Sequence, residues 1–372
     1  MKLVRLLSPY TLGAMKLKNR IVMAPMTRSR AIHNIPNDLM SEYYTQRTAA
    51  GFIITEGTSP SPNGLGYSRI PGIFSLPQIE GWKNITKNVH EKNGRIFVQL
   101  MHTGRIGHPA NLDGHARILA PSAVAASGKI WTDTLGMQTY PIPTAMSLEE
   151  IQSTVEEYKT AAVNAIHAGF DGIELHAANG YLIEQFLSPL SNTRTDAYGG
   201  SIEHRSRFLL EIVQGVKDVI GKHSIGIRLS PYGIANDMPH YPEIEKTYTY
   251  LAEEINRKEI LYIHIVDHQS MGGPEIPAEI KNIFRATFTG AVILSGGYSF
   301  ERAEIELQNG QADLFAFGRS FINNPDLVER FMYGNPLTKE FDTSTLYSAA
   351  AKGYTDYPVY TSEFTKSHNQ KG

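Results

Sequence analysis

The segment AVILSGGYSFERAEIELQNGQADLFAFGR, from Ala291 to Arg319, contains two short apolar runs separated by a helical stretch. The runs, Ala291–Leu294 and Leu314–Phe317, are almost continuously apolar, as expected of parallel strands that are buried on both faces. Parallel strands need a crossover connection, which is usually a helix. The segment therefore predicts an α/β fold with a parallel sheet.

The same pattern recurs along the rest of the chain, where six further apolar runs are each followed by a helical pattern. They are Arg20–Ala24, Gly51–Thr55, Arg95–Leu100, Gly172–Leu175, Ile225–Leu229 and Leu261–Val266. With the two above they make eight, the number of strands in a closed (β/α)₈ TIM barrel. We predict a single domain over residues 1–372, with a barrel core at about 20–333 and a C-terminal tail at 334–372.

Some helix boundaries can also be predicted. Ser147-Leu148-Glu149-Glu150 is a capping box, in which Glu150 can reach back to the Ser147 amide. Asn37-Asp38 precedes a second helix, and Pro325 occupies a position typical of a first helical turn. In contrast, residues 101–146 lack a strong period and form a long loop after the third strand, and loops of that length are usually functional.

The composition excludes several classes of function. A net charge of −2 gives no reason to expect nucleic acid as a partner, and no apolar run approaches the roughly 20 residues that span a bilayer. The chain has no cysteine, which removes thiolate chemistry, and its histidines show no metal-ligand spacing. Ser8, Pro9 and Thr11 interrupt any secretory segment. We expect a cytoplasmic monomer or homodimer without a bound metal.

Residues at the carboxyl ends of the strands form the active sites of (β/α)₈ enzymes. The predicted strand ends therefore define a list of candidate site residues. They are Pro25, Met26 and Thr27 after the first strand, Gly57, Gln99, then His176, Asn179 and Tyr181, Arg228, Gly296 with Gly297, and Gly318 with Arg319.

The glycines after the last two strands favour a phosphate site. Loops after strands seven and eight commonly bind phosphate in this fold, and Arg319 could supply a charged fork to it. Either glycine pair alone is equally compatible with a tight turn.

Arg228 allows two interpretations, an ion pair with Glu174 or a counter-charge for an anionic ligand. The cluster of His176, Asn179 and Tyr181 suggests a pocket for a carbonyl or similar oxygen.

From Leu6 to about Tyr360 the chain resembles the Old Yellow Enzyme family, the FMN-dependent ene-reductases. The motifs that carry the resemblance are spread over nearly the whole chain. They are Asn19–Thr27, Glu56-Gly57, Val98–Leu100, Glu174–Leu182, Gln185–Leu187, the series from Asn192 to Ser201, and Gly353–Pro358.

The resemblance implies a role for each candidate residue. His176 and Asn179 would bind the oxygen of an electron-poor alkene or nitro compound, hydride would pass from FMN to its β-carbon, and Tyr181 would protonate the α-carbon. NADPH, or NADH, would reduce the flavin. The cofactor would be held by Pro25, Met26, Thr27, Gly57, Gln99, Arg228, Gly296, Gly297, Gly318 and Arg319, and the substrate pocket would include Tyr67, Met101 and Tyr347.

Two features depart from the pattern or give no expectation. Met101 stands where many relatives have tryptophan, which should widen or reshape the pocket, and Asp267–Pro277 borders the site without a predicted role. Two other functions compete with the ene-reductase. One is a barrel enzyme without flavin that acts on a phosphorylated substrate, and the other is a flavin-binding protein without catalysis.

Overall fold

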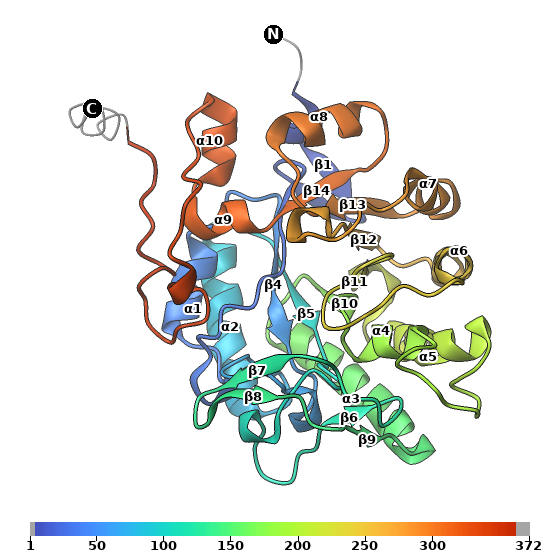
Figure 1. Cartoon of the computed structure of the whole chain (residues 1–372). Helices are drawn as coiled ribbons and strands as arrows, with labels where there is room; N and C mark the ends of the chain where they lie inside the picture. Colours follow the sequence, from blue (N-terminus) through green and yellow to red (C-terminus); the bar gives the residue numbers. More distant parts are fainter. Residues whose placement is uncertain (1–3, 362–372) are drawn as a thin grey trace.

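Eight parallel strands form a closed barrel at the centre of the computed structural model, which describes residues 4–361 (Figure 1). Each strand pairs with the next along the barrel, and the last pairs with the first. The predicted (β/α)₈ barrel is confirmed, because all eight predicted runs are barrel strands. In order they are β3 (Ile21–Met23), β4 (Phe52–Thr58), β5 (Ile96–Leu100), β10 (Gly172–Ala177), β11 (Ile225–Leu229), β12 (Tyr262–Val266), β13 (Ala291–Ser295) and β14 (Leu314–Phe317).

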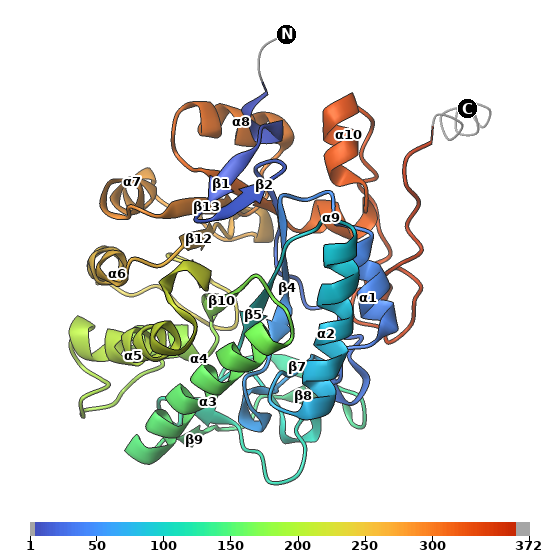
Figure 2. The ribbon, with the colours of Figure 1, turned by 180° about the vertical axis from the view of Figure 1, so that it is seen from behind.

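Helices follow the strands and surround the barrel, as Figure 2 shows from behind. Every residue of β5, β10, β11, β12, β13 and β14 is buried, which explains their apolar sequences. The helices are α1 (Asp38–Thr45), α2 (Leu76–Glu91), α3 (Leu148–His167), α4 (Leu182–Leu187), α5 (Ile202–Ile220), α6 (Ile244–Lys258), α7 (Ala278–Thr287), α8 (Phe300–Gln308), α9 (Arg319–Asn323) and α10 (Leu327–Tyr333).

The predicted helix starts are mostly confirmed. Ser147 is the N-cap of α3 and forms the full capping box with Glu150, and Asn37 caps α1 by accepting from the Met40 amide. The prediction for Pro325 is wrong by two residues, since α10 begins at Leu327 after the N-cap Asp326. Strand β4 also extends beyond its predicted end, so that Glu56 and Gly57 lie within the strand, next to a register shift.

An N-terminal hairpin that the apolar runs did not predict closes one end of the barrel. Its antiparallel strands are β1 (Tyr10–Leu12) and β2 (Met15–Leu17). Leu12 and Leu17 are buried in a cluster with Phe52, Phe97 and Leu261 near the amino ends of the barrel strands. The hairpin therefore seals the end of the barrel opposite to the predicted site.

The long segment after β5 is ordered by four short strands rather than being irregular throughout. They are β6 (Leu119–Ala120), which pairs with β9 (Thr144–Ala145), and the antiparallel hairpin of β7 (Lys129–Thr132) and β8 (Gly136–Thr139). The hairpin lies beside the carboxyl ends of β4 and β5, far from β1 and β2 (Figures 1 and 2).

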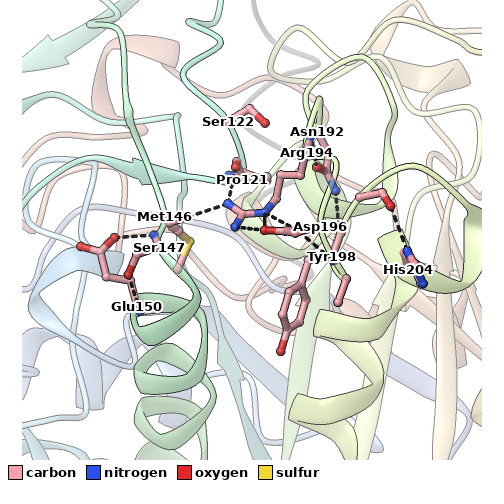
Figure 3. A network of polar contacts seen from close by, with 12 residues as sticks. Pro121, Ser122, Met146, Ser147, Glu150, Asn192, Arg194, Asp196, Tyr198 and His204 are labelled. Atoms are coloured by element: carbon pink, nitrogen blue, oxygen red, sulfur yellow. Dashed lines mark hydrogen bonds and ion pairs between the residues drawn. The ribbon is translucent and has the colours of Figure 1, made fainter.

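Arg194 ties the residues that follow β6 and β9 to the loop between α4 and α5 (Figure 3). Its Nη1 donates to the carbonyl oxygens of Pro121 and Met146, at 2.9 and 2.6 Å, while Asp196 pairs with the guanidinium at 2.5 Å. Asn192 completes the anchor by donating to the carbonyl oxygen of Tyr198 at 2.7 Å. The motif from Asn192 to Ser201 therefore holds the long segment in place, and it lies away from the barrel mouth.

The C-terminal tail returns to the barrel and is held there by two buried arginines. Arg30 donates to the carbonyl oxygens of Thr345 and Leu346, and Arg28 donates to that of Gly353. The ring of Tyr354 is fully buried and stacks on Tyr43 with 4.0 Å between ring centroids. These contacts bring residues 346–349 to the barrel mouth. Within residues 4–361 we find no helix long and apolar enough to cross a membrane.

Candidate active site

A cavity of about 1170 Å³ opens at the carboxyl ends of the barrel strands. Every site residue that the sequence predicted lines it. They are Pro25, Met26, Thr27, Gly57, Tyr67, Gln99, Met101, His176, Asn179, Tyr181, Arg228, Gly296, Gly297, Gly318, Arg319 and Tyr347. These residues come from seven of the eight barrel strands or the loops after them and, for Tyr347, from the C-terminal tail, so the closed barrel brings them together. Their individual roles stay predictions.

Arg228 lines the cavity and, among the described residues, forms no direct ion pair, although the nearby Glu174 carboxylate favours its charged form. Its side chain is buried, and its Nε has no hydrogen-bond partner among the described residues. The ion pair with Glu174 does not form, because Glu174 instead accepts from Gln99 at 2.8 Å and contacts His264 at 2.9 Å. An unpaired buried cation is costly, so Arg228 is suited to an anionic or electron-rich ligand.

Gln99 is oriented by its contact with Glu174. The Gln99 Nε2 donates to that carboxylate, which leaves the amide oxygen of Gln99 as the group available to the cavity. Arg228 and Gln99, on the two strands that flank β10, thus present a cationic donor and a neutral acceptor to the cavity. This pair matches a planar heterocycle that carries both carbonyl groups and an N–H group.

His176 can only donate a hydrogen bond into the cavity. Its Nδ1 accepts from the Ala178 amide at 3.3 Å, so the proton of the neutral ring lies on Nε2. Burial, together with the charges of Arg228 and His264, lowers the pKa of His176, which keeps the ring neutral. His176 is therefore a fixed N–H donor rather than a base.

Tyr181 lies next to His176, with 4.9 Å between ring centroids in an edge-on arrangement. Its hydroxyl donates to the hydroxyl of Tyr67 at 3.2 Å. Burial raises the pKa of both phenols, so both remain protonated at neutral pH. A phenol that keeps its proton at neutral pH and faces the cavity has the chemistry of a general acid.

Asn179 has its backbone in the left-handed region, with φ of +58°, a conformation that asparagine tolerates. Two contacts hold this backbone. The Asn179 amide donates to Ser230 Oγ at 2.8 Å, and its carbonyl oxygen accepts from Asn236 at 2.7 Å. Glu184 supports the same turn by accepting from Ser230 and from the Gly180 amide. The turn thus holds Asn179 between His176 and Tyr181 at the cavity wall.

The other end of the cavity is lined by glycines and one cation. Gly296 and Gly297 have φ of +118° and +88°, and a side chain at either position would collide with Asp267 or Ser270. Arg319 is exposed, and its Nη2 donates to the Ser270 carbonyl oxygen at 2.8 Å. Bare backbone beside a guanidinium is well suited to an anion such as phosphate.

Met101 is buried and packs against the strand that carries Gly57. A Cβ at Gly57 would overlap the sulfur of Met101, so the thioether fills the space above this glycine. The flexible side chain can repack, which distinguishes it from a rigid aromatic ring at the same place.

Several cavity residues were not predicted from the sequence. The β7–β8 hairpin contributes Lys129, Trp131 and Asp133, and the loop after β12 contributes Ser270. Arg69 links the hairpin to the tail, because it pairs with Asp133 and donates to the Tyr347 carbonyl oxygen at 2.7 Å. From the sequence, only the length of the loop after β5 pointed to the hairpin, whereas the segment of Ser270 was expected beside the site without a role. Among the described residues no cluster of acidic or histidine side chains could hold a metal ion.

The cavity fits flavin mononucleotide. Gln99 and the unpartnered Arg228 suit the pyrimidine edge of an isoalloxazine ring, Thr27 and Gly57 line its surroundings, and the glycines with Arg319 suit its phosphate. The fold and this site define the class: a TIM-barrel oxidoreductase that works with a flavin.

Comparison with known proteins identifies the family. The profile of the NADH:flavin oxidoreductase / NADH oxidase family matches residues 5–338. A putative 12-oxophytodienoate reductase 11 of Oryza sativa subsp. japonica is 40% identical, with 96% of this chain and 98% of the relative covered. A probable flavin mononucleotide-dependent alkene reductase of Leishmania infantum is also 40% identical, with coverages of 95% and 97%.

A solved structure of morphinone reductase in complex with tetrahydroNAD superimposes with a TM-score of 0.91, at 42% identity, covering 96% of this chain and 98% of that one. The chain belongs to the NADH:flavin oxidoreductase family. The resemblance to the Old Yellow Enzyme family is confirmed, and with it the flavin and nicotinamide cofactors predicted from the sequence.

Proposed function

We propose that this protein is an NADPH-dependent ene-reductase that reduces the carbon–carbon double bond of α,β-unsaturated carbonyl and nitro compounds. The observation that carries the proposal is the combination of the His176 donor with the protonated Tyr181 in one cavity that fits a flavin. Relatives described as alkene and 12-oxophytodienoate reductases support the same substrate class.

His176 and Asn179 would bind the oxygen of the acceptor. The Nε2–H of His176 and the amide nitrogen of Asn179 are neutral donors, and they stabilise the negative charge that develops on that oxygen as the double bond is attacked. Because the His176 ring is held by the Ala178 amide and the backbone of Asn179 by Ser230, the two donors need little reorganisation during the reaction.

Tyr181 would deliver the proton. Its raised pKa keeps the proton on the phenol until negative charge appears on the α-carbon of the acceptor. Tyr67 accepts the hydrogen bond of Tyr181 before the substrate binds and so fixes the direction of its hydroxyl.

Flavin mononucleotide, when bound, supplies a two-electron carrier that takes hydride from the nicotinamide and passes it to the β-carbon. Gln99 and Arg228 would hold its ring and favour extra electron density there through the positive charge of Arg228. Thr27 would hydrogen-bond a ring carbonyl oxygen, and Gly297, Gly318 and Arg319 would hold the phosphate. Tyr67, Met101 and Tyr347 would line the acceptor pocket. The preference for NADPH over NADH rests on the family resemblance.

The experiment is an anaerobic reduction of the purified protein with NADPH, followed by addition of 2-cyclohexenone. We expect the flavin absorbance to bleach and then to return, with cyclohexanone formed in equal amount. A flavin that bleaches but is not reoxidised by the enone would overturn the proposed acceptor. A protein that neither carries nor takes up FMN would favour the barrel enzyme that acts on a phosphorylated substrate.

A further inference from the structure

The loop after β12, which had no predicted role, places His268 against Asn179 in the loop after β10. His268 is buried, with an exposed fraction of 1%. Its side chain is packed between Gly233 and Gly273, where an added Cβ would come within 2.9 Å of the ring Cε1 and of the His268 Cβ, respectively. The imidazole therefore has little freedom to rotate.

The tautomer of His268 follows from its contact with the backbone. The Ile234 amide donates to its Nδ1 at 3.0 Å, and a backbone N–H can only donate. Burial and the nearby charge of Arg228 lower the pKa of His268 to about 4, so the ring is neutral at neutral pH. Its one ring proton is consequently on Nε2.

That proton is directed at Asn179. The distance from His268 Nε2 to Asn179 Oδ1 is 2.8 Å, and since Nε2 is the donor, the atom that faces it is the amide oxygen. The amide nitrogen of Asn179 consequently points away from His268. An unrestrained amide could turn over, because its oxygen and nitrogen are nearly isosteric, and would then oppose the substrate oxygen with an acceptor.

We infer that His268 is a positioning residue that holds the amide of Asn179 with its nitrogen toward the substrate oxygen. The inference rests on the proposed function, in which Asn179 donates to that oxygen. The backbone of Asn179 is already held by Ser230 and Asn236, whereas among the described residues His268 is the partner of its side chain. The orientation of one oxyanion donor thus depends on a loop 89 residues further along the chain.

Two matched variants distinguish the contact of His268 with the Ile234 amide from its contact with the Asn179 side chain. Asparagine carries its amide oxygen near the place of Nδ1, so His268→Asn can still accept from Ile234, but its amide nitrogen is too close to the backbone to reach Asn179. Glutamine carries its amide nitrogen near the place of Nε2, so His268→Gln keeps the donor. The readout is the affinity of the oxidised holoenzyme for the phenolate of 4-hydroxybenzaldehyde, followed by flavin absorbance.

We expect His268→Asn to weaken phenolate binding about 10–100-fold, as loss of one donor to an anion should, and His268→Gln to restore most of it. The same His268→Asn change in an Asn179→Ala background should alter the affinity less than about threefold, because its target is gone. Flavin retention and the midpoint of urea unfolding serve as structural controls for each variant.

Three results would overturn the inference: no phenolate binding by the wild-type holoenzyme, an unchanged affinity in His268→Asn, or an equal loss with and without Asn179. Because binding to the oxidised protein needs no turnover, the outcome can be read even if reduction of 2-cyclohexenone fails. Failure of the proposed function and failure of this inference are therefore distinguishable.

Discussion

The hydroxyl of Tyr181 donates to the hydroxyl of Tyr67 across 3.2 Å, inside a cavity that raises the pKa of both phenols. If Tyr181 is the acid, Tyr181→Phe should slow reoxidation of the flavin by 2-cyclohexenone about 100-fold or more, the usual contribution of general acid catalysis. Reduction of the flavin by NADPH should be unchanged, because that step needs no proton from Tyr181. Stopped-flow absorbance separates the two half-reactions.

Tyr67→Phe is the matched comparison. It removes the acceptor that directs the Tyr181 hydroxyl but leaves the acid in place, so we expect a smaller decrease in enone reduction, of about tenfold or less, as for the loss of one neutral hydrogen bond. Equal losses in both variants would contradict the assignment of Tyr181 as the proton donor, and so would normal reoxidation of Tyr181→Phe.

Arg319→Ala should weaken retention of FMN. Arg319 is exposed and donates to the Ser270 carbonyl oxygen, so its loss should cost little stability while removing a charge-assisted contact to phosphate. We expect the dissociation constant of FMN to rise about 10–100-fold, as for the loss of one charged hydrogen bond of about 1.5–3 kcal/mol. Titration of the apoprotein with FMN measures this, and Arg257→Ala, which removes an exposed helical ion pair, is the control.

The sequence predicted the barrel well because its signal is local. Each strand is a short apolar run with both faces buried, and the polar residues that follow it must face the mouth once the barrel closes. That topological rule gathered Thr27, Arg228 and Arg319 into one predicted site, although they lie far apart in the chain.

Other parts of the site depend on contacts that no local pattern reveals. The β7 strand has only four residues, too few to show a period. Its place beside the site rests on contacts with residues outside the hairpin, such as the pairing of Arg69 with Asp133 and the bond from Asn111 to the Trp131 carbonyl oxygen. The proposed positioning role of His268 follows from its contacts with Asn179 and Ile234, which lie on two other loops. The residues next to His268 in the sequence therefore give no sign of it.

The buried ring of Tyr354 predicts a test of how the tail contributes to the site. Tyr354→Ala should lower the free energy of unfolding by about 3–5 kcal/mol, the usual cost of truncating a buried aromatic residue. Because the tail carries Tyr347 to the cavity, the KM for the enone should also rise. Urea unfolding and steady-state kinetics measure the two effects. Val359→Ala, at an exposed position of the same tail, should change stability by no more than about 0.5 kcal/mol.

His102 predicts how stability depends on pH. Burial lowers its pKa from 6.5 to about 3, so the folded protein holds it neutral. The unfolded chain takes up its proton as the pH falls below about 6.5, whereas the folded chain does so only near its lowered pKa. The stabilisation is therefore complete above about pH 6.5, the pKa of the unfolded chain, and is lost progressively as the pH falls below it. At pH 4 the loss should be about 3 kcal/mol, from 1.36 kcal/mol for each pH unit below the unfolded pKa.

His102→Asn isolates this contribution. Asparagine keeps an oxygen near the place of Nδ1, which accepts from the Gly104 amide at 3.1 Å, but it cannot be protonated in this range. Between pH 7 and pH 4 the variant should lose about 3 kcal/mol less unfolding free energy than the wild type, as measured by urea unfolding at each pH. His115→Asn, at an exposed position, should follow the wild type. Parallel pH curves for the wild type and His102→Asn would show that burial does not hold His102 neutral.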